Sequence, residues 1–383
     1  MEAMIRKLTT CLLTALLGAA CLAPIGCSGN RTVMESAEGR FVSTVIAMAI
    51  ERGRSIEPID IDTVQQPSHY AFSTLDVSDQ ERYLILLDAL SSRGVRDYPD
   101  NDMDRLSRIR ECVMADHPEL FAVQSVRTET TSYGPAGQIA SVTVQAEYTR
   151  TAEEAEAVLE IARQAARDCY AGFAAGSDDY AKAKRAYDYL AERVEYGRES
   201  SEAPSSDQTI EGALVNGRAV CGGYANSFAY LLQSAGVECA VVSGHADGSN
   251  HAWCLARLDG DYYYVDPTWG DPVDGPMIHD YLAITTADVE REHFATCAFS
   301  LPLCTAVADN YFVRENLLFD WPDEARLAET IASGASQVRC ADWNTYVLLS
   351  DYISSGRLAR QLGIAQYHYS HSDEMLTLAV YPT

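Results

Sequence analysis

The sequence predicts an α+β fold in which a helix that begins with a cysteine packs on an antiparallel sheet carrying a histidine and an aspartate. Two observations favour this fold. An apolar pattern with helical spacing follows Cys221 over residues 225–232. Residues 251–258 and 261–266 flank an Asp-Gly dipeptide, which predicts a β-hairpin with a two-residue turn. An N-terminal α/β region precedes this core, and a small C-terminal α/β appendage follows it.

The region before the core is expected to contain two helices and a hairpin. Ser78 is typical of an N-cap, and Glu81 three residues later completes a capping box. Residues 101–115 have the apolar spacing of a second amphipathic helix. Residues 121–131 and 138–150 are rich in Val, Thr and Tyr and alternate in polarity, which predicts a hairpin.

Two longer helices are expected over residues 153–175 and 178–194, separated by a Gly-Ser break. The second should pack beside the helix that begins at Cys221. Residues 199–207 are rich in Ser, Pro and Asp and predict a surface loop just before that helix. Residues 281–284 could add a strand to the sheet.

The last part of the chain predicts helices over residues 324–333 and 343–356 and a final strand over residues 375–381. The expected organisation is a signal segment (1–27), a tether and poorly defined segment (28–70), N-terminal helices and a hairpin (71–150), a core with the Cys, His and Asp (151–300) and an α/β appendage (301–383).

The first 27 residues are typical of an export signal. Two basic residues precede an uncharged Leu- and Ala-rich run over residues 8–21, which is too short to span a membrane. The run resembles a bacterial lipoprotein signal, in which a cysteine becomes the lipidated first residue. Cys21 follows small residues, whereas Cys27 directly precedes a polar tether and is preferred. We therefore expect an extracytoplasmic protein that a lipid anchors to the cell membrane; an ordinary secretory signal is the alternative.

Composition excludes some classes of partner. The 383 residues carry a net charge of −26, which argues against nucleic-acid binding and against a polybasic membrane patch. Export implies an oxidising compartment in which disulfides can form. Cys297 and Cys304, joined by a short loop, are the favoured pair, although sequence alone does not establish connectivity. His293 and Cys297 have i, i+4 spacing on a possible helix, but two ligands do not make a metal site.

Cys221, His251 and Asp266 together indicate nucleophilic chemistry. A cysteine at a helix N-terminus is favoured as a thiolate by the unpaired N–H groups and the helix dipole. If the hairpin turn has two residues, Leu258 pairs with Asp261, and His251 and Asp266 become diagonal neighbours on one face, about 7–8 Å apart. A three-residue loop would place them on opposite faces.

Each of the three residues also has an ordinary structural reading, as a buried thiol, a hydrogen-bonding imidazole and a turn-forming aspartate. Their order and local context favour a nucleophile, a base and an orienting carboxylate. A metal site formed by Cys221, His251 and Asp266 is disfavoured, because closely paired ligands are lacking. We expect no metal and no organic cofactor.

The segments EGALVNGRAVCGGYANSFAYLL and NHAWCLARLDGDYYYVDPTWGDP, within residues 209–271, resemble the bacterial transglutaminase-like, or transglutaminase/protease-like, superfamily. DHPELF at residues 116–121 and the segment 179–197 resemble exported members with an extra N-terminal region. The resemblance implies a papain-like/transglutaminase-like core with a Cys on a helix, a His on a strand and an Asp on the next strand. Gly222 departs from the Glu or bulky residue of many members.

The resemblance implies an acyl-transfer enzyme that acts on peptide, isopeptide or glutamine-type amides at the cell surface through a thioester. Hydrolysis is preferred over cross-linking, because excluding water requires a dry, shaped tunnel. The alternative is a non-catalytic surface module that binds peptides or cell-wall material in a relict cleft. The candidate oxyanion donors are Gln208, Asn216 and Gly222, and the candidate cleft residues are Gly223, Tyr224, Trp253 and Trp269.

Overall fold

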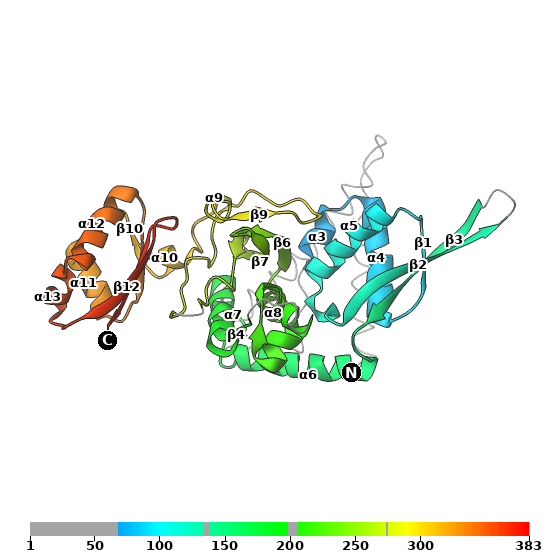
Figure 1. Cartoon of the computed structure of the whole chain (residues 1–383), viewed down its shortest axis with the longest axis horizontal. Helices are drawn as coiled ribbons and strands as arrows, with labels where there is room; N and C mark the ends of the chain where they lie inside the picture. The colour runs from blue at the N-terminus through cyan, green and yellow to red at the C-terminus, as the bar shows by residue number, and fades with distance from the viewer. Residues whose placement is uncertain (1–67, 134–137, 198–204, 273–274, 383) are drawn as a thin grey trace, which may run out of the picture. The chain divides into compact units, whose positions relative to one another are not determined.

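The computed structural model describes residues 68–133, 138–197, 205–272 and 275–382 (Figure 1). The expected signal segment, both candidate lipidation sites (Cys21 and Cys27) and the tether up to residue 67 lie outside the described residues. Most of the expected loop over residues 199–207 lies outside them too. Within the described part of the chain, no helix combines the length and apolar character needed to cross a bilayer.

The described part of the N-terminal region contains the helices α3 (Tyr70–Thr74), α4 (Val77–Ser92) and α5 (Met103–Asp116) and a 3-10 turn (Pro118–Leu120). Its sheet consists of β1 (Arg96–Tyr98), β2 (Val123–Tyr133) and β3 (Gln138–Tyr148). The three strands are antiparallel in the order β1-β3-β2, which confirms the predicted hairpin. The predicted start of α4 is wrong by two residues. Asp76, not Ser78, is the N-cap, and its side chain accepts a 2.9 Å hydrogen bond from the N–H of Asp79.

The core holds the helices α6 (Ala152–Cys169), α7 (Asp179–Arg193) and α8 (Cys221–Ser234) and the strands β6 (Cys239–Ala246), β7 (Ser249–Leu258), β8 (Asp261–Val265) and β9 (His293–Ala295). The four strands form an antiparallel sheet in the order β8-β7-β6-β9. Two short helical turns, η3 (Ser205–Gln208) and η4 (Glu211–Asn216), and the parallel pair β4 (Glu195–Tyr196) and β5 (Arg218–Ala219) lead into α8. A further turn, α9 (Thr286–Val289), precedes β9.

The hairpin between β7 and β8 has the predicted register. Leu258 pairs with Asp261, and the ladder continues to Cys254 and Val265. Both turn residues have positive φ, 48° at Asp259 and 110° at Gly260, as a two-residue turn of this twist requires. The ladder ends there, because the N–H of the next residue, Asp266, donates to the carbonyl oxygen of Tyr281 at 3.0 Å. The strand expected over residues 281–284 is reduced to a single bridge between Tyr264 and Ile284.

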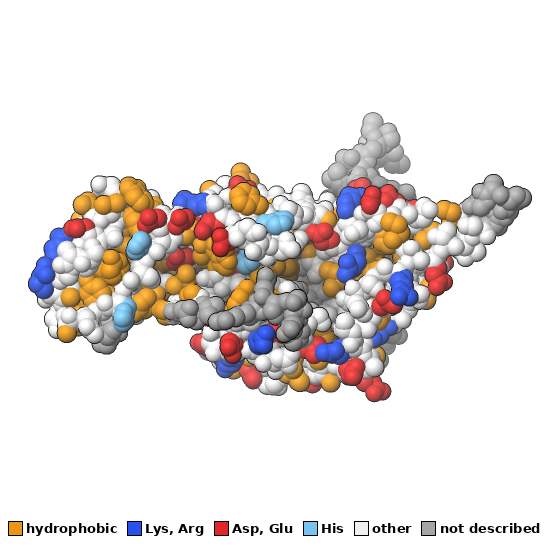
Figure 2. Space-filling view, viewed as in Figure 1, with side chains coloured by type: hydrophobic (Ala, Val, Ile, Leu, Met, Phe, Trp, Pro, Cys, Tyr) orange, Lys and Arg blue, Asp and Glu red, His pale blue; other side chains and the backbone are white. Residues whose placement is uncertain are grey.

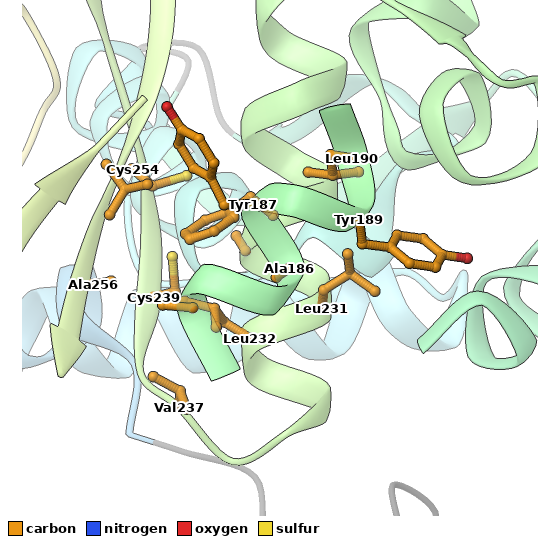
Figure 3. Close-up of a cluster of buried hydrophobic side chains, with 14 of the residues drawn as sticks. Ala186, Tyr187, Tyr189, Leu190, Leu231, Leu232, Val237, Cys239, Cys254 and Ala256 are labelled. Carbon is orange, nitrogen blue, oxygen red and sulfur yellow. The ribbon is translucent and has the colours of Figure 1, made fainter. Parts of the chain in front are cut away.

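One face of this sheet packs on α7 and α8 (Figure 3). Tyr187 and Leu190 of α7 and Leu231 and Leu232 of α8 meet Cys254 of β7 in a continuous buried cluster. The prediction that the helix before the loop packs beside the cysteine-bearing helix is therefore confirmed. Complete burial of side chains of this size is worth roughly 1.5–3 kcal/mol each, so α8 is held firmly against the sheet.

The opposite face of the same sheet packs on the N-terminal helices. Val242 of β6 and Trp253 and Leu255 of β7 share a buried cluster with Leu86 of α4 and Ile109 of α5. Alternate residues along β7 thus serve two different cores, as expected for a strand covered on both faces. The N-terminal region is consequently part of the support of the sheet.

The C-terminal region has its own hydrophobic cluster. It contains β10 (Leu318–Phe319), α11 (Glu324–Ala332), β11 (Gln337–Cys340), α12 (Trp343–Ser354), α13 (Arg357–Leu362), β12 (Tyr367–Ser372) and β13 (Thr377–Pro382), preceded by the short helix α10 (Tyr311–Arg314). The strand order is β10-β11-β13-β12. The predicted helices and final strand are confirmed, with ends that shift by one or two residues. On the face shown in Figure 2, acidic and basic side chains are interspersed rather than gathered into one charged patch.

Two expectations around β9 are wrong. His293 and Cys297 do not share a helix, because residues 293–295 form β9, paired with β6. Cys297 and Cys304 are both free thiols. Each sulfur instead faces a nearby carbonyl oxygen, that of Phe299 at 3.5 Å and that of Pro302 at 3.7 Å.

Candidate active site

Cys221 is the first residue of α8 and is 5% exposed. The preceding residue, Val220, makes no side-chain hydrogen bond to the helix start. The sulfur therefore lies where the helix dipole and the N–H groups of the first turn favour negative charge. This is the position that the apolar pattern after the cysteine predicted.

Gly222, a candidate oxyanion donor, and Gly223, a candidate cleft residue, both lie where α8 packs against η3. A Cβ atom at Gly222 would overlap the side-chain amide of Gln208 and lie 3.1 Å from the main-chain carbonyl oxygen of the same residue. A Cβ atom at Gly223 would overlap the carbonyl of Asp207 and lie 2.7 Å from the Cβ of Ala219. The two glycines therefore let η3 approach the start of α8. The departure at Gly222 makes room for Gln208.

Gln208 is thereby placed beside the helix start that carries Cys221. Its main chain is tied to α8 by Asn226, whose side-chain amide donates to the carbonyl oxygens of Gln208 at 3.2 Å and Gly222 at 2.7 Å. Gln208 and Asn226 also line a hollow of about 250 Å³. Asn216, the other candidate oxyanion donor, is exposed at the end of η4 and does not line this hollow.

His251 lies on β7 and joins the other two predicted residues. Its Nε2 is 2.7 Å from Oδ2 of Asp266, so Nδ1 is the nitrogen that remains for an interaction with Cys221. Burial disfavours the charged imidazole, but the carboxylate of Asp266 and the hydrogen bond to Cys221 outweigh burial and raise the pKa of His251 to about 10. The geometry favours an imidazolium beside the sulfur.

Asp266 is 1% exposed and fully hydrogen-bonded. Its Oδ1 accepts from the N–H groups of Thr268 at 2.9 Å and Trp269 at 3.1 Å. Its Oδ2 accepts from His251 and also from Nε2 of His293 at 2.9 Å. Burial alone would favour the neutral acid, but the two histidines hold the pKa of Asp266 well below its usual range. The carboxylate is therefore ionised and fixed in orientation.

His293 is the residue that sequence reasoning missed. It is 2% exposed and reaches Asp266 because β9 pairs with β6, with His293 opposite Ala246. Its ring lies 4.4 Å from the ring of Trp269 and 5.0 Å from that of Trp253. No local pattern signals this contact, since it depends on the pairing of a three-residue edge strand.

Of the four candidate cleft residues, Trp269 lines a hollow on the described part of the chain. This hollow of about 580 Å³ is bordered by His251, Trp269, Asp247 and Asn250, among others. Trp253 and Gly223 are buried. Tyr224 is also buried, and its hydroxyl donates to the carbonyl oxygen of Val194 and to Asp271.

Among the described residues, these two histidines and this carboxylate also form a group that could hold a metal ion. His251, Asp266 and His293 each offer one ligand atom, and these atoms lie within 4.8 Å of one another. Imidazole and carboxylate groups suit zinc. The observed 2.7 and 2.9 Å separations are hydrogen-bond distances, however, and a metal here would compete with the contact of His251 to Asp266.

Comparison with known proteins gives a family-model match over part of the chain. Residues 163–267 match the family model of the transglutaminase-like superfamily, so the core is a transglutaminase-like domain of the α+β class. Kyphoscoliosis peptidase of Mus musculus is 36% identical over 62 residues, which cover 13% of this chain and 9% of the mouse protein. The chain thus spans less than a tenth of that relative.

Two solved structures are similar over parts of the chain. One is described as a TGase, with 16% identity, a TM-score of 0.29 and coverage of 40% of this chain and 47% of that one. The other is the periplasmic domain of TgpA from Pseudomonas aeruginosa, with 15% identity, a TM-score of 0.20 and coverage of 38% and 62%.

Proposed function

We propose that the protein is a cysteine acyl-transfer enzyme that cleaves peptide, isopeptide or glutamine-type amides through a thioester. The observation that carries this proposal is the 2.7 Å hydrogen bond between Nε2 of His251 and Asp266, together with the placement of Cys221 at the start of α8, where it acts on the imidazole of His251. A nucleophile, a base and an orienting carboxylate in this order are the parts that acyl transfer requires. The roles of the three residues rest on this geometry.

In the proposed reaction, the proton of Cys221 already resides on Nδ1 of His251, and the thiolate attacks the carbonyl carbon of the substrate. The developing oxyanion accepts hydrogen bonds from the side-chain amide of Gln208 and from a backbone N–H at the start of α8. When the C–N bond breaks, the leaving amine takes the proton from His251. A water molecule then gives a proton to His251 and attacks the thioester, which releases the acid and restores the thiolate.

Hydrolysis is proposed over cross-linking because water can reach the base. The hollow beside His251 is bordered by the exposed polar residues Asp247, Ser249 and Asn250. Transfer to an amine would require a site that excludes water. We also propose that the enzyme works outside the cytoplasm on peptide or protein substrates, anchored to the membrane by a lipid at Cys27 or, failing that, Cys21.

The decisive experiment measures the reactivity of Cys221. The full-length protein is treated with iodoacetamide at about pH 6, well below the pKa of about 8.5 of a free cysteine. Labelling is then quantified by mass spectrometry of the peptide that contains Cys221. We expect alkylation at least tenfold faster than in the His251→Ala variant. Equal, slow rates in both proteins would support the relict binding module instead.

A further inference from the structure

We propose that His293 is a positioning residue of the catalytic site, which holds the Asp266 carboxylate through a second hydrogen bond to the oxygen that His251 uses. The inference rests on the proposed function, since it assigns a role within the same site. It adds a fourth residue, from a different strand, to the group formed by Cys221, His251 and Asp266.

The first argument is the geometry of the shared oxygen. Oδ2 of Asp266 receives Nε2 of His251 at 2.7 Å and Nε2 of His293 at 2.9 Å. Both rings must carry a proton on Nε2 to donate to the same carboxylate oxygen. In the neutral His251 ring this tautomer makes Nδ1 the nitrogen that takes the proton of Cys221, which gives the imidazolium. The arrangement around Asp266 therefore selects the tautomer that the reaction requires.

The second argument is the surroundings of His293. Its Nδ1 is buried and has no hydrogen-bond partner among the described residues. The rings of Trp269 at 4.4 Å, Trp253 at 5.0 Å and Tyr281 at 5.9 Å surround it. An unsatisfied nitrogen on a buried imidazole lowers the stability of the fold, so the presence of histidine here calls for a functional explanation. The contact with Asp266 supplies that explanation, since it is the hydrogen bond that the structure gives to this side chain.

The third argument is the restraint that each hydrogen bond supplies. Thr268 and Trp269 hold Oδ1 through backbone N–H groups of the same short segment that carries Asp266. His293 holds Oδ2 from β9, on the far side of β6 from His251. The carboxylate is thus held from two separate elements. If the contact from β9 were lost, the hydrogen bond from His251 would be the remaining one to Oδ2 among the described residues.

The test compares two amide side chains of different length. In His293→Gln the amide nitrogen lies at about the reach of the imidazole Nε2 and can still donate to Asp266. In His293→Asn the amide is too short to do so. His293→Leu removes the donor while keeping apolar volume. The readout is the rate of alkylation of Cys221 by iodoacetamide at about pH 6, where an unassisted thiol reacts slowly.

A matched control is available at His279. This buried histidine also contacts a carboxylate through Nε2, but that carboxylate is Asp188, at 2.9 Å, rather than Asp266. We expect His293→Leu and His293→Asn to lower the alkylation rate about tenfold. We expect His293→Gln to stay within about threefold of the native protein, and His279→Leu to react at the native rate.

Two results would overturn the inference. One is a native alkylation rate in folded His293→Leu. The other is an equal loss of alkylation rate in His293→Gln and His293→Asn, which would show that the site requires the volume of the ring rather than its hydrogen bond. If His293→Leu does not fold, the comparison of Gln with Asn still decides. Slow labelling of the native protein itself would refute the proposed function rather than this inference.

Discussion

Substitution of Gly222 by alanine should disable the oxyanion site while leaving the nucleophile intact. The new Cβ would overlap the side-chain amide of Gln208 and lie 3.1 Å from the main-chain carbonyl oxygen of Gln208. The far end of this flexible side chain can move away at low cost in stability, and the main-chain oxygen has to yield by only a few tenths of an ångström. Gln208 would therefore leave the helix start, and a lost oxyanion donor lowers kcat by roughly 10²–10³, or about 2.7–4 kcal/mol.

Two reactions of the same sulfur separate this effect from general damage. Turnover of p-nitrophenyl acetate forms an oxyanion, whereas alkylation of Cys221 by iodoacetamide does not. Gly222→Ala should lower ester turnover by at least about tenfold and leave the alkylation rate unchanged. Gln208→Ala should do the same. Because both changes remove one contact, the double variant should be no worse than either single variant.

Gly223→Ala is the matched contrast. There the new Cβ would meet the carbonyl of Asp207 and the Cβ of Ala219 at 2.7 Å. Backbone cannot move aside as a side chain can, so overpacking of about 1–3 kcal/mol should appear as a lower melting temperature. Full ester turnover in Gly222→Ala, or additive losses in the double variant with Gln208→Ala, would refute the reasoning about Gln208.

Three further predictions follow from the structure and the sequence. Because the pKa of His251 is raised from 6.5 to about 10, its stabilisation is complete below pH 6.5 and is lost as pH rises to about 10; the melting temperature of His251→Gln should fall less over this range. Gly260→Val should strain the hairpin turn by about 1–2 kcal/mol and lower turnover further than Gly334→Val, which meets the same positive φ and open space in the C-terminal region; equal turnover in both would show that the register is set elsewhere. Cys27→Ala should release the protein from the detergent phase or leave its signal segment unprocessed. If Cys27→Ala has neither effect, Cys21→Ala should have one of them. A soluble protein with a free, non-cysteine N-terminus would contradict the proposed anchor.

Much of the site could be predicted because its parts are encoded locally. The turn at Gly260 sets the register of β7 and β8, and that register alone brings His251 and Asp266 to one face. The start of α8 follows from the apolar spacing after Cys221. Each of these inferences needs no more than about twenty neighbouring residues. Local patterns do not fix a helix end to the exact residue, because Asp76 and Ser78 are both good N-caps; in the structure Asp76 is the N-cap of α4.

The parts that escaped prediction depend on contacts between elements that are distant in sequence or irregular. The sequence indicates Gln208 as a candidate oxyanion donor, but its close approach to the helix start, where η3 packs against α8, follows from no periodicity. His293 reaches Asp266 through a three-residue edge strand whose partner lies about fifty positions earlier. Both residues lie next to residues that the sequence did identify, Gln208 at the start of α8 and His293 at Asp266. The local signals thus specify the candidate reacting groups, while the long-range contacts specify how those groups are held, and the comparison of His293→Gln with His293→Asn tests this division directly.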